Sequence, residues 1–206
     1  MGKRQIAHAL RWLRRFLEGN QGELARRIRA LPKMSDIVIQ MVMDASPWGM
    51  GGVLFINGRP KEWFASPLED YDLKVLEEKR GMPDGQASFE ALAILIALRA
   101  WAQTWQDEAA LILTRSDSMA ALGAVLKSSA GTVRMDRVMQ ELALDMADGL
   151  YEPAIVSHLP AQWNVLADAL SRMFQPGKNT GIPHELNNVP RVDVDGRGPS
   201  WWRTQL

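Results

Sequence analysis

Four acidic residues occupy positions where a purely structural plan would place apolar or neutral side chains. Asp44 ends the apolar run "DIVIQMVMDAS", Glu90 lies near the start of "SFEALAILIALRAW", Asp117 ends "LILTRSD", and Asp168 interrupts "NVLADAL". Functional groups in open α/β sheets gather at the carboxyl ends of neighbouring strands, so Asp44 and Asp117 are expected to meet if their strands are adjacent and parallel. Carboxylates held this close need a cation or a proton. Because the chain has no cysteine, its oxygen ligands favour Mg²⁺ or Mn²⁺ over zinc.

Each acid also has an ordinary structural explanation. Asp44, which precedes Ala-Ser-Pro, is suited to an Asx turn. Asp117 is suited to capping the helix that follows it, and the helix dipole favours Glu90 if it lies in a first turn. Asp168 is harder to explain in this way, because it is expected in the second turn of its helix, with Asn164 one turn earlier on the same face. For each acid alone, both interpretations stay open.

The predicted elements form the frame that must position these acids. Val- and Ile-rich runs and the hairpin signal Asn57-Gly58 predict three consecutive antiparallel strands, over 36–46, 51–58 and 59–66. Two more strands, over 109–117 and 152–160, are reached through helices and are therefore expected to be parallel to the first. The predicted helices cover 88–105, 118–128, 131–150 and 164–174, the last with Asn164 as its cap. The sequence thus predicts an α/β fold in which helices flank a mixed five-stranded sheet.

The neutral net charge hides an uneven distribution along the chain. Residues 1–34 carry nine basic and two acidic residues, a net charge of +7, whereas residues 35–174 carry eleven basic and nineteen acidic residues, a net charge of −8. We expect a basic segment of two short helices over 1–34, one domain over 35–174, and an extended or disordered tail over 175–206. A basic arm beside an acidic body suits nucleic acid and metal, but a solvated basic helix beside an ordinary acidic domain explains the charge equally well.

Segments that direct a chain to or across a membrane are not predicted. Apolar runs are too short to cross a bilayer, and the N-terminus lacks the apolar stretch of a secretory signal. The Arg-rich start is also compatible with a transit peptide, but Glu18, Glu23 and the short link to the next element argue against it. We therefore expect an intracellular protein without a membrane partner, in the cytoplasm or the nucleus.

Four stretches together resemble the ribonuclease H domain attached to the reverse transcriptases of gypsy-like and DIRS-like retroelements. They are "DASPWGMGGVL", "FEALAILIALRAW", "TRSDSMAAL" and "SHLPAQWNVLADALSR". The last is the most specific, because an Asn four residues before the Asp and Leu-Ser-Arg after it are a signature of those domains. The resemblance covers residues 36–174 and implies a ribonuclease H-like fold. Residues 1–34 resemble the connection to the polymerase, and the polymerase motif Tyr-x-Asp-Asp is absent. We therefore expect a fragment, monomeric in isolation, whose polymerase domain is covalently linked or missing.

The resemblance also implies an activity and a set of site residues. The family hydrolyses the RNA strand of RNA/DNA hybrids, and Asp44, Glu90, Asp117 and Asp168 would hold two Mg²⁺ ions, or Mn²⁺. His158, ten residues before Asp168, would assist proton transfer or product departure, although a strand-end histidine with a structural hydrogen bond is the ordinary alternative. The substrate contacts that we expect are Ser46, Gly49, Gly51, Ser118, Asn164 and Arg172. The glycines would let the backbone approach the hybrid, or mark a bulge.

Some features depart from the family pattern. The polar loop 67–87, which has room for a short helix, is rich in acids that are expected to repel a phosphate backbone. Affinity for nucleic acid would therefore come from Arg134, Arg137, Arg172, the N-terminal helices or a polymerase domain. One rival is an inactive relic that keeps the fold and binds nucleic acid weakly. Another is a transposase or integrase of the same broad fold, which would end its set of acids with a glutamate rather than with Asp168.

Overall fold

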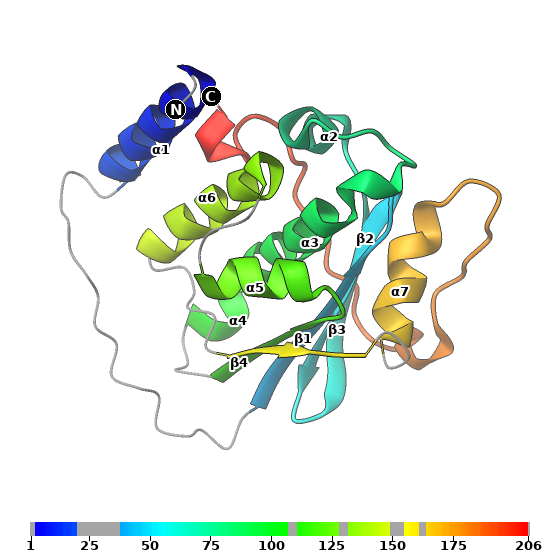
Figure 1. The fold of residues 1–206 in the computed structure, drawn as a ribbon. Coiled ribbons are helices and arrows are strands. Elements are labelled where there is room, and N and C mark those ends of the chain that lie inside the picture. The colour runs from blue at the N-terminus through cyan, green and yellow to red at the C-terminus, as the bar shows by residue number, and fades with distance from the viewer. Residues whose placement is uncertain are drawn as a thin grey trace.

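The computed structural model describes residues 3–19, 38–106, 111–127, 132–148, 155–160 and 164–205. Five strands form one mixed sheet in the order β3-β2-β1-β4-β5 (Figure 1). They are β1 Val38–Ala45, β2 Gly49–Ile56, β3 Arg59–Pro67, β4 Leu111–Ser116 and β5 Ile155–His158. β2 is antiparallel to both β1 and β3, β4 is parallel to β1, and β5 is parallel to β4. The predicted mixed sheet is therefore confirmed.

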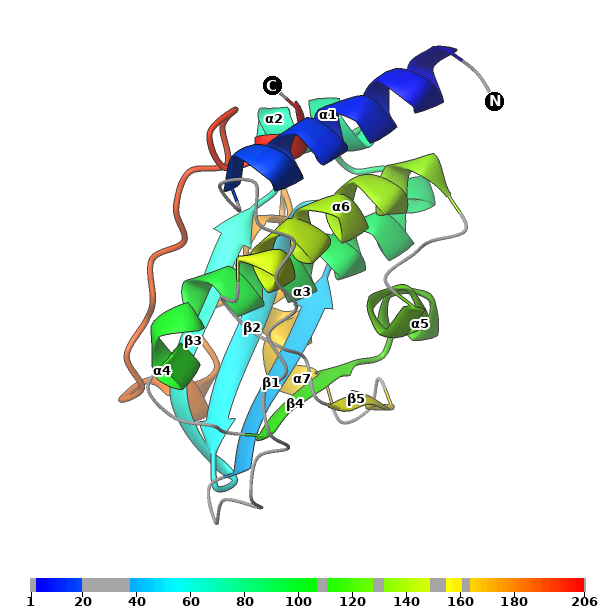
Figure 2. The same cartoon turned by 90° about the vertical axis from the view of Figure 1, so that its left-hand side faces the viewer.

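Helices cover both faces of this sheet. One face carries α3 Gln86–Ala100, α5 Met119–Lys127 and α6 Val133–Ala147, and the other carries α7 Val165–Ser171 (Figures 1 and 2). The remaining helices are α1 Lys3–Gly19, α2 Asp70–Leu76 and α4 Ala102–Gln106, with 3₁₀ turns η1 Pro83–Gly85, η3 Arg172–Phe174, η4 His184–Leu186 and η5 Arg203–Gln205. The predicted helix over 88–105 is two helices, because the backbone leaves helical geometry at Trp101.

The alternation of β1 divides its side chains between the two faces of the sheet. Ile39, Met41 and Met43 point into the main core beneath α3, whereas Asp44 points to the α7 face. α3 is apolar almost all round and is buried from Ser88 to Leu98, since the sheet lies on one side of it and α5 and α6 lie on the other. This arrangement carries Glu90 of α3 into the interior at the carboxyl end of β1.

Two glycines of β2 allow α7 and the turn after it to approach the sheet closely. A Cβ atom added to Gly51 would lie 2.4 Å from Leu170 Cβ and 2.8 Å from the Ala167 carbonyl oxygen. A Cβ added to Gly49 would lie 2.4 Å from a ring carbon of Phe174. This packing explains both glycines without the substrate contact that the sequence suggested. The irregularity in the β2–β3 register lies farther along β2, at Leu54 and Phe55.

The chain after Phe174 packs against the domain at several points. We call residues 175–205 the C-terminal strap. The strap is extended apart from short turns, and it crosses the edge of β3, where Trp63 N donates to Pro190 O at 3.1 Å and Val192 N donates to Trp63 O at 2.8 Å. Figure 2 shows it passing from the α7 side of the sheet to the helical layer. It therefore covers a sheet edge that would otherwise expose unpaired backbone groups.

Trp202 and Arg197 anchor this strap in the interior. Trp202 belongs to the main core, and Trp201 packs against that core. The fully buried Arg197 guanidinium lies 2.7 Å from Asp72 of α2, and Trp202 Nε1 donates to the same carboxylate at 3.0 Å. Burial raises the pKa of Asp72, and the Arg197 charge opposes that shift.

The acids of loop 67–87 have partners within the domain. Besides Asp72, the loop pairs Glu77 with Arg137 and Glu78 with Arg134, each at 2.6 Å. The loop therefore presents less free negative charge than the sequence suggested. The same pairs engage Arg134 and Arg137, and Arg137 is buried. The expected part of these two arginines in gripping nucleic acid stays a prediction.

The basic helix α1 lies on the outside of α6 (Figures 1 and 2). Trp12 Nε1 donates to Gln140 O at 3.1 Å, and Arg15 Nε donates to Arg203 O of the strap at 3.0 Å. The second predicted N-terminal helix, over 21–31, lies outside the described residues. Among the helices that are described, none has both the length and the apolar composition that a membrane crossing requires.

We predict that Trp202→Ala lowers the free energy of unfolding by about 3–5 kcal/mol, because it empties a fully buried aromatic site. Urea denaturation of the whole chain, followed by circular dichroism, measures this change. Ile182→Ala, at an exposed position in the same strap, is the control and should change stability by less than about 1 kcal/mol. Equal small effects of both substitutions would mean that the strap does not contribute to the core.

Candidate active site

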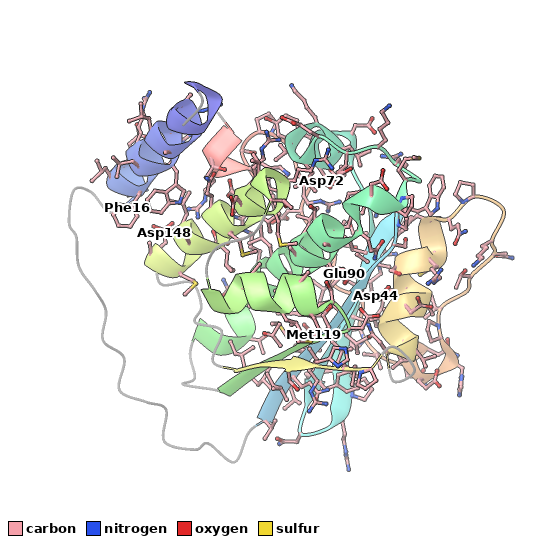
Figure 3. All side chains as sticks on the ribbon, viewed as in Figure 1. Phe16, Asp44, Asp72, Glu90, Met119 and Asp148 are labelled. Atoms are coloured by element: carbon pink, nitrogen blue, oxygen red, sulfur yellow. The ribbon has the colours of Figure 1, made fainter. Side chains whose placement is uncertain are left out.

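Three of the predicted acids converge at one edge of the sheet. Carboxylate oxygens of Asp44, Glu90 and Asp117 all lie within 4.8 Å of one another. β1 and β4 are adjacent and parallel, with Val42 opposite Arg115, so the acids two residues later meet at the carboxyl ends of both strands. Glu90 reaches the same point from α3, and Figure 3 shows it beside Asp44.

Residues at the two ends of α7 hold the Asp44 side chain in place. Its side chain is buried, with 5% of the residue exposed. Ser171 Oγ, at the end of α7, donates to Asp44 Oδ2 at 2.6 Å. Asn164, immediately before α7, donates its amide to Asp44 Oδ1 at 3.3 Å and to Met43 O at 3.1 Å. Asn164 therefore occupies the cap position as predicted, but its side chain holds Asp44 instead of capping the helix.

Glu90 is held by donors that the sequence did not reveal. It is 3% exposed and accepts hydrogen bonds from Ala45 N at 3.2 Å, Gln86 Nε2 at 2.7 Å and Ser116 Oγ at 3.3 Å. Gln86 also donates to Ala45 O at 2.6 Å, so it ties the start of α3 to the end of β1. The spacing of four residues between Gln86 and Glu90 is the one available signal, since such residues are neighbours on a helix.

The electrostatics of the cluster favour a proton or a cation. Burial raises the pKa of Asp44 to about 7, the Ser171 hydrogen bond opposes this shift, and the charges of Asp117 and Asp168 add to it. Burial, followed by the charges of Asp44 and Asp117, raises the pKa of Glu90 well above its usual value. Oxygen ligands at this spacing fit a hard divalent cation, which would relieve both effects.

Asp44 and Asp117 had ordinary explanations as a turn residue and a helix cap. Neighbouring serines make the corresponding hydrogen bonds instead. Ser46 Oγ accepts hydrogen bonds from Trp48 N and Gly49 N, both at 3.2 Å, and so closes the turn after β1 in place of Asp44. Ser118 Oγ accepts from Ala121 N at 3.2 Å at the start of α5, where a cap at Asp117 had been considered. The predicted substrate contacts Ser46 and Ser118 therefore have structural roles.

The remaining acids differ in helical position from what the sequence suggested. α3 begins at Gln86, so Glu90 lies beyond the first turn. The helix dipole, which favours acids in the first turn, therefore does not explain it. Asp168 lies in the first turn of α7 rather than in the second. It forms an ion pair with Arg172 at 2.6 Å and lies outside the group of three mutually close carboxylates, although its charge contributes to the raised pKa of Asp44. Its part as a fourth ligand stays a prediction.

His158 lies at the same edge of the sheet. It ends β5, is exposed, and is in register with Ser116, the residue before Asp117. Leu159 N donates to Ser116 O at 3.0 Å, which keeps the end of β5 beside β4. This placement is compatible with the predicted role in proton transfer, which stays a prediction.

Comparisons with known proteins return likenesses in structure alone. Models of protein families give no match, and curated proteins give none either. A ribonuclease H1 named LC11, isolated from compost by a metagenomic approach, aligns with a TM-score of 0.47 and 15% identity, over 66% of this chain and 93% of its own. Ribonuclease H1 from the halophilic archaeon Halobacterium salinarum NRC-1 aligns with a TM-score of 0.40 and 16% identity, over 66% and 95%.

The sheet has the order β3-β2-β1-β4-β5, and β4 and β5 are parallel to β1, as the sequence predicted for its fourth and fifth strands. The fold is ribonuclease H-like. Both alignments are loose, so this statement rests on the order and the directions of the strands. In the ribonuclease H-like domain of this chain, the acidic cluster lies where β1 and β4 end, next to the N-terminal half of α3.

We predict that Mn²⁺ stabilises the protein more at pH 8 than at pH 5.5. The pKa of Asp44 is near 7 in the folded protein and near 3.9 in an unfolded chain, so without a cation stability falls as the pH rises through this window. A cation must displace the same proton, so its affinity rises over the same window. Thermal denaturation with and without Mn²⁺ at both pH values measures this stabilisation. At pH 8, with Mn²⁺ at a hundred times its Kd, the gain in the free energy of unfolding should be about 2.7 kcal/mol.

Asp44→Asn should abolish this stabilisation by Mn²⁺ at pH 8, whereas Asp84→Asn, at an exposed acid of loop 67–87, should retain it. The same gain from Mn²⁺ at both pH values, or in Asp44→Asn, would show that the cation binds elsewhere.

Proposed function

We propose that this chain is a metal-dependent endoribonuclease that hydrolyses the RNA strand of RNA/DNA hybrids. The observation that carries the proposal is the meeting of Asp44, Glu90 and Asp117 at the carboxyl edge of β1 and β4. Buried like charges destabilise a fold unless a proton or a cation compensates them, so they are expected where they serve a function. The ribonuclease H-like order of the strands supports the proposal that RNA hydrolysis takes place at this end of the sheet.

Asp44, Glu90 and Asp117 would hold Mg²⁺ or Mn²⁺, and Asp168 beside them would help to hold a second ion. Such ions, when bound, activate water and stabilise the leaving oxygen of an in-line phosphodiester displacement. The contribution of the chain is to fix the carboxylates in place. Ser171 and Asn164 orient Asp44, while Gln86 and Ser116 orient Glu90.

His158 would move protons at the exposed margin of this site. Its imidazole stands at the end of β5, beside the strand that bears Asp117, where solvent reaches it. An imidazole exchanges protons near neutral pH, which suits delivery to a leaving oxygen or help with product departure.

The grip on the hybrid would come from Arg172 and from a second domain. Arg172 is exposed beside the cluster, where it pairs with Asp168. Arg134 and Arg137 are paired with Glu78 and Glu77, away from the cluster. α1 packs on the outside of α6, so the structure supplies few free cations near the acids. A covalently linked or separate polymerase domain of a gypsy-like or DIRS-like retroelement would provide the remaining contacts, and the sequence motifs support that context.

An inactive relic that binds nucleic acid weakly is the second candidate. The ion pair between Asp168 and Arg172 favours it, because Arg172 neutralises the fourth carboxylate without any cation. The cluster of three carboxylates, two of them buried, favours the enzyme, since a relic gains nothing from keeping like charges together. The candidates differ in whether the intact chain cleaves a hybrid.

We predict that Asp44→Asn, Glu90→Gln and Asp117→Asn each reduce Mg²⁺-dependent cleavage by more than about a hundredfold, since loss of a residue behind a metal ligand already costs 10–100-fold. Cleavage of a labelled RNA/DNA hybrid is measured on denaturing gels beside single-stranded RNA and duplex DNA, with Asp84→Asn as the control. Cleavage retained by Asp44→Asn would refute the assignment. An intact chain that binds Mn²⁺ but leaves the hybrid uncut would be the relic.

We further predict that His158→Ala slows hybrid cleavage by about a hundredfold, the lower range for loss of a general acid or base. The thermal stabilisation by Mn²⁺ at pH 8 should not change, because His158 is outside the acidic cluster. Asn179→Ala, at an exposed polar position of the strap, is the control and should cleave at the original rate. An unchanged rate of hybrid cleavage in His158→Ala would show that the imidazole takes no part in the reaction.

A further inference from the structure

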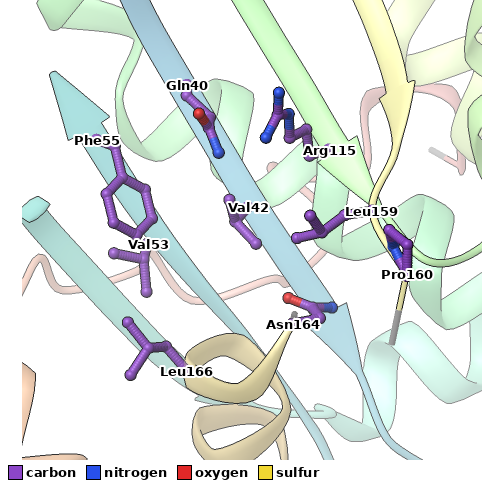
Figure 4. A pocket seen from close by; sticks show the side chains of 9 residues that line it. All are labelled: Gln40, Val42, Val53, Phe55, Arg115, Leu159, Pro160, Asn164 and Leu166. Atoms are coloured by element: carbon purple, nitrogen blue, oxygen red, sulfur yellow. The ribbon is translucent and has the colours of Figure 1, made fainter. Parts of the chain in front are cut away.

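A groove of about 480 Å³ lies on the α7 face of the sheet, over the part of β1, β2 and β4 that α7 leaves open (Figure 4). Its walls are mainly apolar and come from Val42, Val53, Phe55, Leu159 and Leu166. The volume falls within the range of about 300–1,000 Å³ that is usual for small-molecule sites. The groove adjoins the acidic cluster, because Asn164 lines the groove and also donates to Asp44.

The groove contains a cation that lacks a partner. Arg115 of β4 lines it, is half-buried, and has an Nε atom that is buried without a hydrogen-bond acceptor. Within the described ranges, no carboxylate lies at ion-pair distance from its guanidinium. The other arginines of these ranges that are buried or half-buried all have a carboxylate partner: Arg15, Arg99, Arg137, Arg197 and Arg203. An unpaired charge away from water raises the free energy of the folded state, so we expect an anion to bind beside Arg115.

Two more polar groups lie at opposite ends of the groove. Gln40 of β1 stands beside Arg115, and Asn164 lies at the α7 end (Figure 4). Asn164 is 1% exposed and its Oδ1 has no hydrogen-bond donor among the described residues, although its Nδ2 is engaged with Asp44. The groove thus combines an apolar middle, a cation with a neighbouring amide at one end, and an unused acceptor at the other.

We propose that this groove binds a small organic carboxylate with an aromatic body. The carboxylate pairs with the Arg115 guanidinium, whose planar donors match it in two parallel hydrogen bonds. The aromatic body lies between Val42, Val53 and Leu166, which removes apolar surface from water. A carboxylate supplies the anion that no described residue provides at the Arg115 guanidinium, so charge complementarity favours this class over neutral ligands. The proposal does not depend on the nuclease activity.

Binding of indole-3-acetate, which combines a carboxylate with a flat apolar ring, tests this site on the whole chain. In ¹H–¹⁵N and ¹H–¹³C spectra we expect saturable shifts at the Arg115 Nε–H and at the methyl groups of Val42, Val53 and Leu166. Indole-3-acetamide has the same ring without the charge, and should bind at least about tenfold more weakly. Equal binding of the acid and the amide, or shifts confined to residues outside the groove, would overturn the proposal.

Variants of Arg115 separate this site from general attraction of anions. Arg115→Gln should weaken binding of indole-3-acetate by about tenfold or more, and Arg115→Lys should keep part of the affinity because it retains the charge. Arg59→Gln, at the exposed β2–β3 hairpin, is the matched control and should bind as the original chain does. If Arg115→Gln does not fold, the proposal is still tested by Arg115→Lys and by comparing indole-3-acetate with indole-3-acetamide on the original chain. Unchanged binding in a folded Arg115→Gln, or no binding of indole-3-acetate to the original chain, would refute the assignment.

Discussion

The approach of three carboxylates, two of them buried, to within 4.8 Å of one another is the constraint on which the arrangement of this domain depends. Removal from water and the neighbouring negative charges both favour protonation of Asp44 and Glu90, which explains the direction in which their pKa values move. A folded chain keeps such a cluster only if its scaffold holds the acids in place. The parallel pairing of β1 with β4 brings Asp44 to Asp117, and α3, buried all round, carries Glu90 to the same point.

α7 completes the site because it touches Asp44 from both of its ends. Asn164 and Ser171 donate hydrogen bonds to this carboxylate, and Gly51 lets the helix lie close enough to β2 for both contacts. On the other side of the molecule, the C-terminal strap closes the edge of β3 and buries Arg197 against Asp72 of α2. Packing far from the acids thus supports the two layers between which they lie.

The sequence predicted the sheet and singled out four acids, of which the structure brings three together, because both the strands and the acids leave local signals. Strand runs alternate or are continuously apolar, and an acid at the end of such a run is conspicuous, as at Asp44 and Asp117. The partners of those acids leave no such signal, since Ser116 and Ser171 resemble any serine until the chain has folded. The strap was missed for the same reason: Arg197 and Trp202 lie in a stretch without periodicity, and their contacts with Asp72 span more than a hundred residues.

The most direct test of this account is the position of a cation in crystals grown with Mn²⁺ at pH 8. Anomalous diffraction locates manganese without assumptions about the nuclease reaction. We expect a peak within coordinating distance of carboxylate oxygens of Asp44, Glu90 and Asp117, about 2.0–2.3 Å away for a hard cation with oxygen ligands. Well-ordered carboxylates without an anomalous peak between them, or manganese bound only elsewhere on the chain, would contradict it.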